Sequence, residues 1–162
     1  GAQNVGASRY DRLNKGIYSA SLMGFGYSLL AFGVAWFFGR SLTGLFVSGG
    51  SSAQLVELAQ TYMITNVLAY PLLTLVNVVR FMIQGMGFSM FAILAGVMEM
   101  AARSLAGMFL VPALGYFGAA LGSPLAWVAA DLFLVPAYFR CRRVLMSQSH
   151  HLHVMGESAE SN

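Results

Sequence analysis

Four long apolar segments, separated by short runs of helix-breaking residues, constrain this chain more than any other feature. They lie near residues 17–38, 58–83, 88–111 and 118–139. Each is long enough to cross the hydrocarbon core of a bilayer, which takes about 20 residues of helix. Hydrophobic residues make up 57% of the chain and charged residues only 9%, whereas soluble domains carry about 25% charged residues. The sequence therefore predicts an integral membrane protein.

The breaks between these segments contain glycine, serine and proline, which interrupt helices. They are residues 39–52, with the run Ser48-Gly49-Gly50-Ser51-Ser52, then Gly85-Met86-Gly87, and residues 112–115. The apolar segments do not alternate with period two, so helices are expected rather than barrel strands. The predicted fold is all-α, with about four transmembrane helices within residues 17–145. We expect residues 1–16 to form a cytoplasmic link and residues 146–162 a disordered cytoplasmic tail.

The positions of Lys and Arg predict the orientation of the chain in the membrane. Basic residues precede the first segment and follow the last one: Arg9, Arg12, Lys15, Arg140, Arg142 and Arg143. The turns after the first and third segments contain only Arg40. Because basic residues favour the cytoplasmic side, both ends are expected to be cytoplasmic, in a multi-pass protein of the plasma membrane. The same clustering explains the net charge of +3 without a nucleic-acid partner.

The first residues of the chain are not expected to form a signal peptide. They contain no initiator methionine, no charged n-region and no cleavage site. We expect the chain to begin partway through a longer one.

The second apolar segment carries a stripe of polar side chains at three- and four-residue steps, which places them within one narrow arc of a helix. They are Asn66, Tyr70, Thr74, Asn77, Arg80 and Gln84. One interpretation is hydrogen bonding to neighbouring helices. The other is that this arc lines a water-filled cavity. Pro71 removes one backbone hydrogen bond and is expected to bend the helix, either as a fixed kink or as a hinge.

The third segment contains Glu99 one helical turn before Arg103, the favoured order for an ion pair along a helix. As a structural pair, the two side chains would neutralise each other inside the membrane. As a functional pair, Glu99 would take up a proton or help to hold a substrate, and Arg103 would adjust its acidity. Neither interpretation needs a metal ion.

The fourth segment places an acid beside aromatic surface, because Trp127, Asp131 and Tyr138 fall close to one helix face. A carboxylate next to an aromatic ring suits organic cations. The alternative is an ordinary helix contact in which Asp131 pairs with Arg103 or Arg80.

The sequence contains no phosphate-cradling glycine loop, no zinc motif and no nucleophile with a base nearby, so we expect neither an enzyme nor a cofactor. His150, His151 and His153 could bind a stray metal ion, but they are expected to belong to the disordered tail.

Five motifs, in order, resemble the C-terminal lobe of multidrug and toxic compound extrusion (MATE) transporters. They are Gln3-Asn4-Val5-Gly6-Ala7 followed by Arg9-Tyr10-Asp11-Arg12, then Gln84-Gly85-Met86-Gly87, the stretch from Gly96 to Arg103, Gly115-Tyr116-Phe117-Gly118, and the stretch from Pro124 to Asp131. The resemblance extends from Gln3 to about Leu145.

The resemblance implies that the four segments are the last helices, nine to twelve, of a two-lobed, twelve-helix transporter. Such transporters export organic, often cationic, compounds in exchange for protons or sodium by alternating access. The implied partners are small organic substrates, a coupling cation, membrane lipids and the remaining helices of the transporter. Some members carry an acid in the tenth helix, where this chain has Asn77 and Arg80.

In this interpretation the cavity would be lined by the polar face of the second segment and by Glu99, Arg103, Trp127 and Asp131, with the two acids favouring cationic substrates. Two other functions remain open. A lipid-linked oligosaccharide flippase of the same superfamily would carry an anionic cargo and would favour a cavity rich in arginine. The other is a non-transporting membrane scaffold or an inactive fragment.

Overall fold

The computed structural model describes the backbone of residues 1–46 and 53–160, and the side chains of residues 1–45 and 53–148. This part of the chain folds into six helices and contains no strand, so the all-α prediction is confirmed. The helices are α1 (Ala2–Gly6), α2 (Asp11–Phe46), α3 (Ala53–Leu68), α4 (Tyr70–Gly85), α5 (Ser89–Leu114) and α6 (Tyr116–Glu160).

Three described helices, α2, α5 and α6, are long and apolar enough to cross a membrane. The pair α3 and α4, bent by 47° at the break between them, is long and apolar enough for a fourth span if the two helices count as one. Pro71 lies in the first turn of α4, directly after this break. A proline there cannot donate a backbone hydrogen bond to the preceding turn, and this explains why the predicted bend occurs at this point.

The helices extend further than the apolar segments predict. In the predicted break at residues 39–52, α2 continues to Phe46, and Thr43 donates a hydrogen bond to the Gly39 carbonyl at 2.8 Å. Residues 47–52, with the Ser-Gly-Gly-Ser-Ser run, lie outside the described residues. In the predicted break at residues 112–115, α5 passes through Pro112 and ends only before Gly115, where φ is +59°. Hydropathy marks the apolar part of a helix, whereas its ends depend on backbone hydrogen bonding.

The tail also differs from its prediction. Its backbone continues α6 as a helix to Glu160, where the sequence predicts disorder from residue 146. No proline follows Pro136, so no residue in this segment removes a backbone donor and stops the helix. Residues 161–162 and the side chains of His150, His151 and His153 lie outside the described part of the chain.

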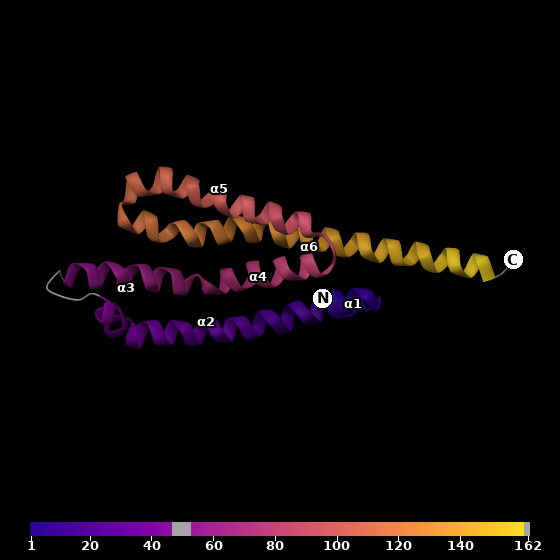
Figure 1. Ribbon diagram of the computed structural model, residues 1–162, viewed down its shortest axis with the longest axis horizontal. Helices are drawn as coiled ribbons and strands as arrows, with labels where there is room; N and C mark the ends of the chain where they lie inside the picture. The colour runs from indigo at the N-terminus through magenta and orange to yellow at the C-terminus, as the bar shows by residue number, and fades with distance from the viewer. Residues whose placement is uncertain (47–52, 161–162) are drawn as a thin grey trace.

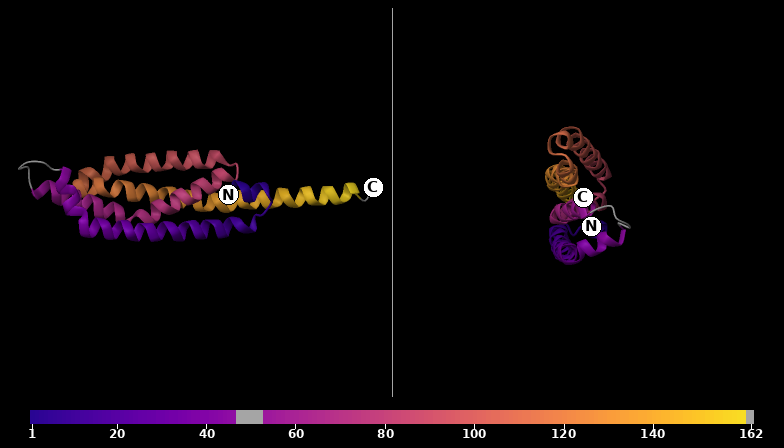
Figure 2. Two further views of the ribbon diagram at one scale, coloured as in Figure 1. Left: turned by 60° about the horizontal axis from the view of Figure 1, so that its bottom comes forward. Right: turned by 90° about the vertical axis from the view of Figure 1, so that its left-hand side faces the viewer.

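The helices lie roughly parallel or antiparallel to one another, with α2 and α5 at opposite edges and α4 and α6 between them (Figures 1 and 2). The start of α2 and the C-terminal half of α6 lie at the same end of the molecule (Figure 1). The core lies where α4 meets α6 and α2, and its fully buried side chains include Leu13, Val76, Ile83 and Leu134. This central position makes α4 the helix that contacts each of α2, α5 and α6.

The outward faces of α2 and α5 are apolar and exposed, as expected for helices in lipid or against further helices. On α2, Met23 is 77% and Phe37 79% exposed, and on α5 the exposed fractions of Met108 and Phe109 are both 68%. Such surfaces would be costly in water, so this exposure agrees with a membrane environment.

Glycine allows close contact between helices at two positions. A Cβ atom on Gly118 would collide with the backbone carbonyl of Leu110, where the start of α6 folds back on α5. A Cβ atom on Gly24 would collide with the side chain of Thr74, where α2 crosses α4. Glycine is therefore required at these two crossings for steric reasons.

The substitution Gly118→Ala is expected to destabilise the protein, because the added methyl group meets backbone atoms of α5 that cannot rotate away. We expect a loss of about 1–3 kcal/mol, typical of overpacking. Gly107→Ala on α5 is the matched control, because nothing lies within 4 Å of its Cβ position, and it should be neutral or slightly stabilising. Thermal unfolding of the purified protein in detergent measures both effects. Equal melting temperatures for the two variants would contradict the assigned contact.

Candidate functional site

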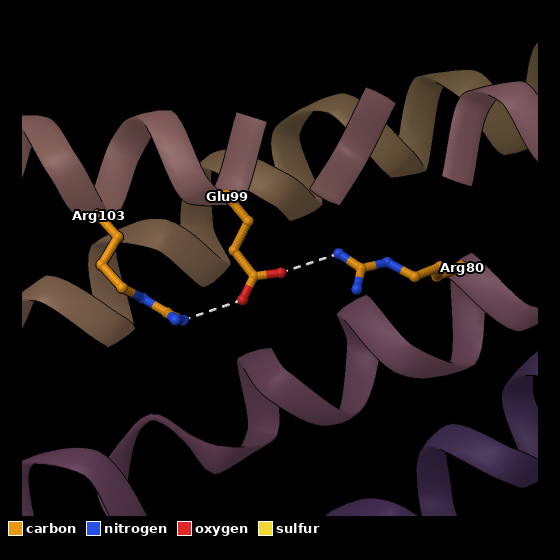
Figure 3. Close-up of polar contacts among 3 residues, drawn as sticks. All are labelled: Arg80, Glu99 and Arg103. Carbon is orange, nitrogen blue, oxygen red and sulfur yellow. Dashed lines mark hydrogen bonds and ion pairs between the residues drawn. The ribbon is translucent and has the colours of Figure 1, made fainter. Parts of the chain in front are cut away.

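Three charged side chains form one network between α4 and α5. Arg80 of α4 donates to Glu99 Oε2 at 2.9 Å, and Arg103 of α5 donates to Glu99 Oε1 at 3.0 Å. Glu99 thus lies between two guanidinium groups (Figure 3). The predicted Glu99–Arg103 ion pair is present, and Arg80 joins it from the neighbouring helix. The network therefore has two positive charges and one negative charge.

The two halves of this network differ in exposure. The side chains of Arg80 and Glu99 are 21% and 19% exposed, whereas Arg103 is 52% exposed. Arg103 also borders a hollow of about 340 Å³ on α5, together with Gly96, Met100 and Ser104. The Arg80 Nε atom is buried and has no hydrogen-bond partner among the described residues. Arg80 therefore ties α4 to α5, while Arg103 faces open space.

The polar stripe of the second segment is shared among several neighbours. Thr74 approaches Ser28 of α2, with 3.4 Å between the two hydroxyl oxygens, and Ser28 also donates to the Gly24 carbonyl at 2.8 Å. Tyr70, Thr74 and Asn77 line a hollow of about 430 Å³ between α2 and α4. Towards the C-terminal end of the stripe, Arg80 turns to α5. Part of the stripe therefore bonds to neighbouring helices and part of it lines open space.

The two ends of the stripe behave differently from its middle. Asn66 lies on α3, before the bend, and its Nδ2 donates to the Tyr62 carbonyl one turn earlier, at 2.9 Å. Gln84 lies at the end of α4 with an exposed side chain. Because the 47° bend separates α3 from α4, the single arc predicted from an unbroken helix does not extend to Asn66.

Helix α6 carries a buried acid and contributes Trp127 to an aromatic pair with Tyr70 of α4. The ring of Trp127 meets that of Tyr70 edge to face, with 6.3 Å between centroids. Asp131 lies one turn further along α6, and its exposed fraction is 8%. Neither of its carboxyl oxygens has a hydrogen-bond partner among the described residues. The predicted alternative of a pair with Arg80 or Arg103 is not present, because both arginines contact Glu99.

The sequence did not predict one polar contact and two partnerless polar groups that the described part of the structure contains. Tyr138 of α6 donates to Asn14 Oδ1 of α2 at 2.7 Å, which joins the first and last spans. Ser21 is buried, with no hydrogen-bond partner for its hydroxyl among the described side chains. The Arg142 Nε atom is also buried and has no hydrogen-bond partner among the described residues. Tyr138 had a sequence signal, since it shares a helix face with Asp131, but nothing in the sequence identifies Asn14 as its partner.

The described residues contain no group of three or more His, Cys, Asp or Glu side chains that could hold a metal ion. The polar groups of the site are the Arg80–Glu99–Arg103 network, the buried acid Asp131, which has no partner among the described residues, and the hollow lined by Tyr70, Thr74 and Asn77. Inside a membrane, such groups mark paths or binding sites for polar solutes.

A protein-family model described as MatE matches residues 1–102, which is more than half of the chain. The chain belongs to the MatE family. MatE proteins are all-helical membrane transporters, so this chain is a multi-pass membrane protein of the MATE transporter type. The match covers α1 to α4 and half of α5, and it includes Arg80 and Glu99 but not Asp131. Searches of curated proteins and of solved structures found no match.

In this MatE chain, the contact between Arg80 and Glu99 should contribute more to stability than that between Arg103 and Glu99. Exposed pairs four residues apart on a helix contribute about 0.3–0.5 kcal/mol. Shielded hydrogen bonds between charged groups contribute about 1.5–3 kcal/mol. We therefore expect a double-mutant cycle of Arg80→Gln and Glu99→Gln to give a larger coupling energy than the cycle of Arg103→Gln and Glu99→Gln.

The matched control is the cycle of Arg103→Gln and Glu99→Gln, measured by equilibrium unfolding in mixed micelles under the same conditions. The expected order would be contradicted if the two coupling energies were equal, or if the one with Arg103 were larger.

Proposed function

We propose that this chain forms part of one lobe of a two-lobed exporter. The exporter extrudes organic, often cationic, compounds in exchange for protons or sodium ions. The exporter works by alternating access in the plasma membrane, with both ends of this chain cytoplasmic. The MatE match supports transport of this general type. The single observation that carries the proposal furthest is Asp131, a buried acid without a partner.

Asp131 is suited to a role that changes during transport. An ionised carboxylate buried without a counter-ion or a donor costs several kcal/mol, and a bound cation or proton removes that cost. Because both of its oxygens lack partners, Asp131 can accept such a cation without first breaking an ion pair. In the Tyr70–Trp127 aromatic pair one turn away, Trp127 is buried, and the Tyr70 ring, which lines the hollow between α2 and α4, is the one available to an organic cation.

Glu99 has a different role in this proposal. Both of its oxygens already accept hydrogen bonds from arginines, so it attracts a cation less strongly than Asp131 does. Glu99 keeps Arg80 and Arg103 in place at the cavity wall, where Arg103 is half exposed. Asp131 therefore contributes more than Glu99 to the proposed preference for cationic substrates.

The angle between α3 and α4 can change at the bend between them. Alternating access requires helices that change their angle while the binding site stays near the middle of the membrane. Pro71 interrupts backbone hydrogen bonding at the 47° bend, and we propose it as the hinge. The remaining helices of the transporter would complete the cavity around Tyr70, Asn77 and Asp131.

A second candidate function is that of a flippase for lipid-linked oligosaccharides. The excess positive charge of the Arg80–Glu99–Arg103 network favours it, because Arg103 could pair with the phosphate groups of such a cargo. A flippase should move an anionic lipid-linked cargo, and its activity should not require Asp131.

Asp131→Asn is expected to lower dye efflux at least tenfold, because the amide cannot exchange a proton or neutralise a cation. Ethidium efflux from cells that produce the full transporter is the measurement, with the amount of protein in the membrane checked by immunoblot. Glu57→Gln, at an exposed acid of α3, is the matched control and should leave efflux unchanged. Normal efflux by Asp131→Asn would refute the role assigned to this acid.

A further inference from the structure

A third hollow lies between α2, α4 and α6, and it does not include the Arg80–Glu99–Arg103 network. Its volume is about 340 Å³. Its walls are almost entirely apolar and include Ile17, Phe25, Leu75, Val135 and Phe139. Phe25 is 39% and Phe139 50% exposed, so the hollow is a groove that opens on the outer surface of the helices.

The groove runs along the helices. Its residues on α2 extend from Asn14 to Phe25, a distance of about 16 Å at 1.5 Å per helical residue. Since transmembrane helices lie close to the bilayer normal, so does the groove. An acyl chain of a membrane lipid has the same direction, a comparable length and the same apolar character.

One end of the groove is polar and positively charged. The Tyr138–Asn14 hydrogen bond, 2.7 Å long, closes this end. Lys15 follows Asn14 on α2, and Arg142 and Arg143 lie one turn after Tyr138 and Phe139 on α6. The start of α2 and the C-terminal half of α6 lie at the same end of the molecule (Figure 1). The nearest acid in sequence is Asp11, so this end carries an excess of positive charge.

The basic side chains at this end have no acidic partner among the side chains that the structure describes. Among the described residues, no ion pair involves Lys15, Arg142 or Arg143. The Arg142 Nε atom is buried and has no hydrogen-bond partner in the described part of the chain. A buried arginine donor without an acceptor is costly, and a phosphate oxygen is the acceptor that a guanidinium binds best.

We propose that this groove binds an anionic phospholipid, with one acyl chain between α2 and α6 and the phosphate beside Arg142 and Lys15. Basic pockets between transmembrane helices at the membrane surface hold anionic headgroups in this way. The lipid would join the first span to the last one alongside the Tyr138–Asn14 hydrogen bond. This site is independent of the transport function proposed above, since it requires only a membrane.

The test is binding of a phosphatidylglycerol with a photoactivatable acyl chain to the purified protein in detergent. Phosphatidylcholine with the same chains is the competing probe. We expect preference for phosphatidylglycerol, and crosslinks at residues of α2 and α6 that line the groove. Equal binding of the two lipids, or crosslinks confined to other surfaces, would overturn the proposal.

Two variants with matched controls locate the site. Arg142→Gln should lower the preference for phosphatidylglycerol about fivefold, the usual contribution of one basic residue near a membrane surface. Arg40→Gln, towards the other end of α2, should leave the preference for phosphatidylglycerol unchanged. Ile17→Trp should fill the groove and reduce crosslinking of both lipids, whereas Leu29→Trp, at a position that is 73% exposed, should not. An Arg142→Gln protein that folds and keeps the full preference would contradict the headgroup position.

Discussion

The cost of a charge in apolar surroundings governs how this chain is built. Glu99 lies in a helix whose other faces are apolar, and it is tolerated because Arg80 and Arg103 each donate to one of its oxygens. Arg80 reaches Glu99 from α4, so the requirement for a counter-ion also fixes how α4 faces α5. Asp131 is the exception, because it is buried and has no partner among the described residues. A membrane protein that keeps such an acid gives up stability, and a transport cycle in which the acid binds a cation gives a reason for keeping it.

The polar groups divide the fold into two faces for which different roles are proposed. Tyr70, Thr74 and Asn77 line one hollow between α2 and α4, on the side where substrates and water are proposed to pass. The groove between α2, α4 and α6 is apolar and charged only at its end, as expected for a surface in contact with lipid. Because α4 takes part in both hollows, its bend and its packing link the transport face to the lipid face. Movement at Pro71 would therefore alter both hollows.

Local features of this fold could be predicted from sequence, and contacts between helices could not. The Glu99–Arg103 pair follows from a spacing of four residues, and the bend follows from Pro71. The partner of Arg80 could not be predicted, because periodicity gives the face of a helix but not the helix that lies opposite. For the same reason, the pairing of Asp131 remained open until the arrangement of α4, α5 and α6 was known. The apolar segments did not predict that α2 extends to Phe46 and α6 to Glu160, because hydropathy marks the apolar part of a helix and not its full length.

The accessibility of Asn77 to water tests the proposed transport cavity most directly. Cys141 is the only cysteine of the given sequence and is buried, so Cys141→Ser, in a transporter whose other helices are also freed of cysteine, leaves one introduced thiol to follow. Asn77→Cys should react with a membrane-impermeant thiol reagent in intact membranes, and a transported dye should slow the reaction. Leu22→Cys, at an exposed apolar position of α2, should not react, because lipid surrounds it. An Asn77→Cys thiol as unreactive as that of Leu22→Cys would contradict a water-filled cavity on this face of α4.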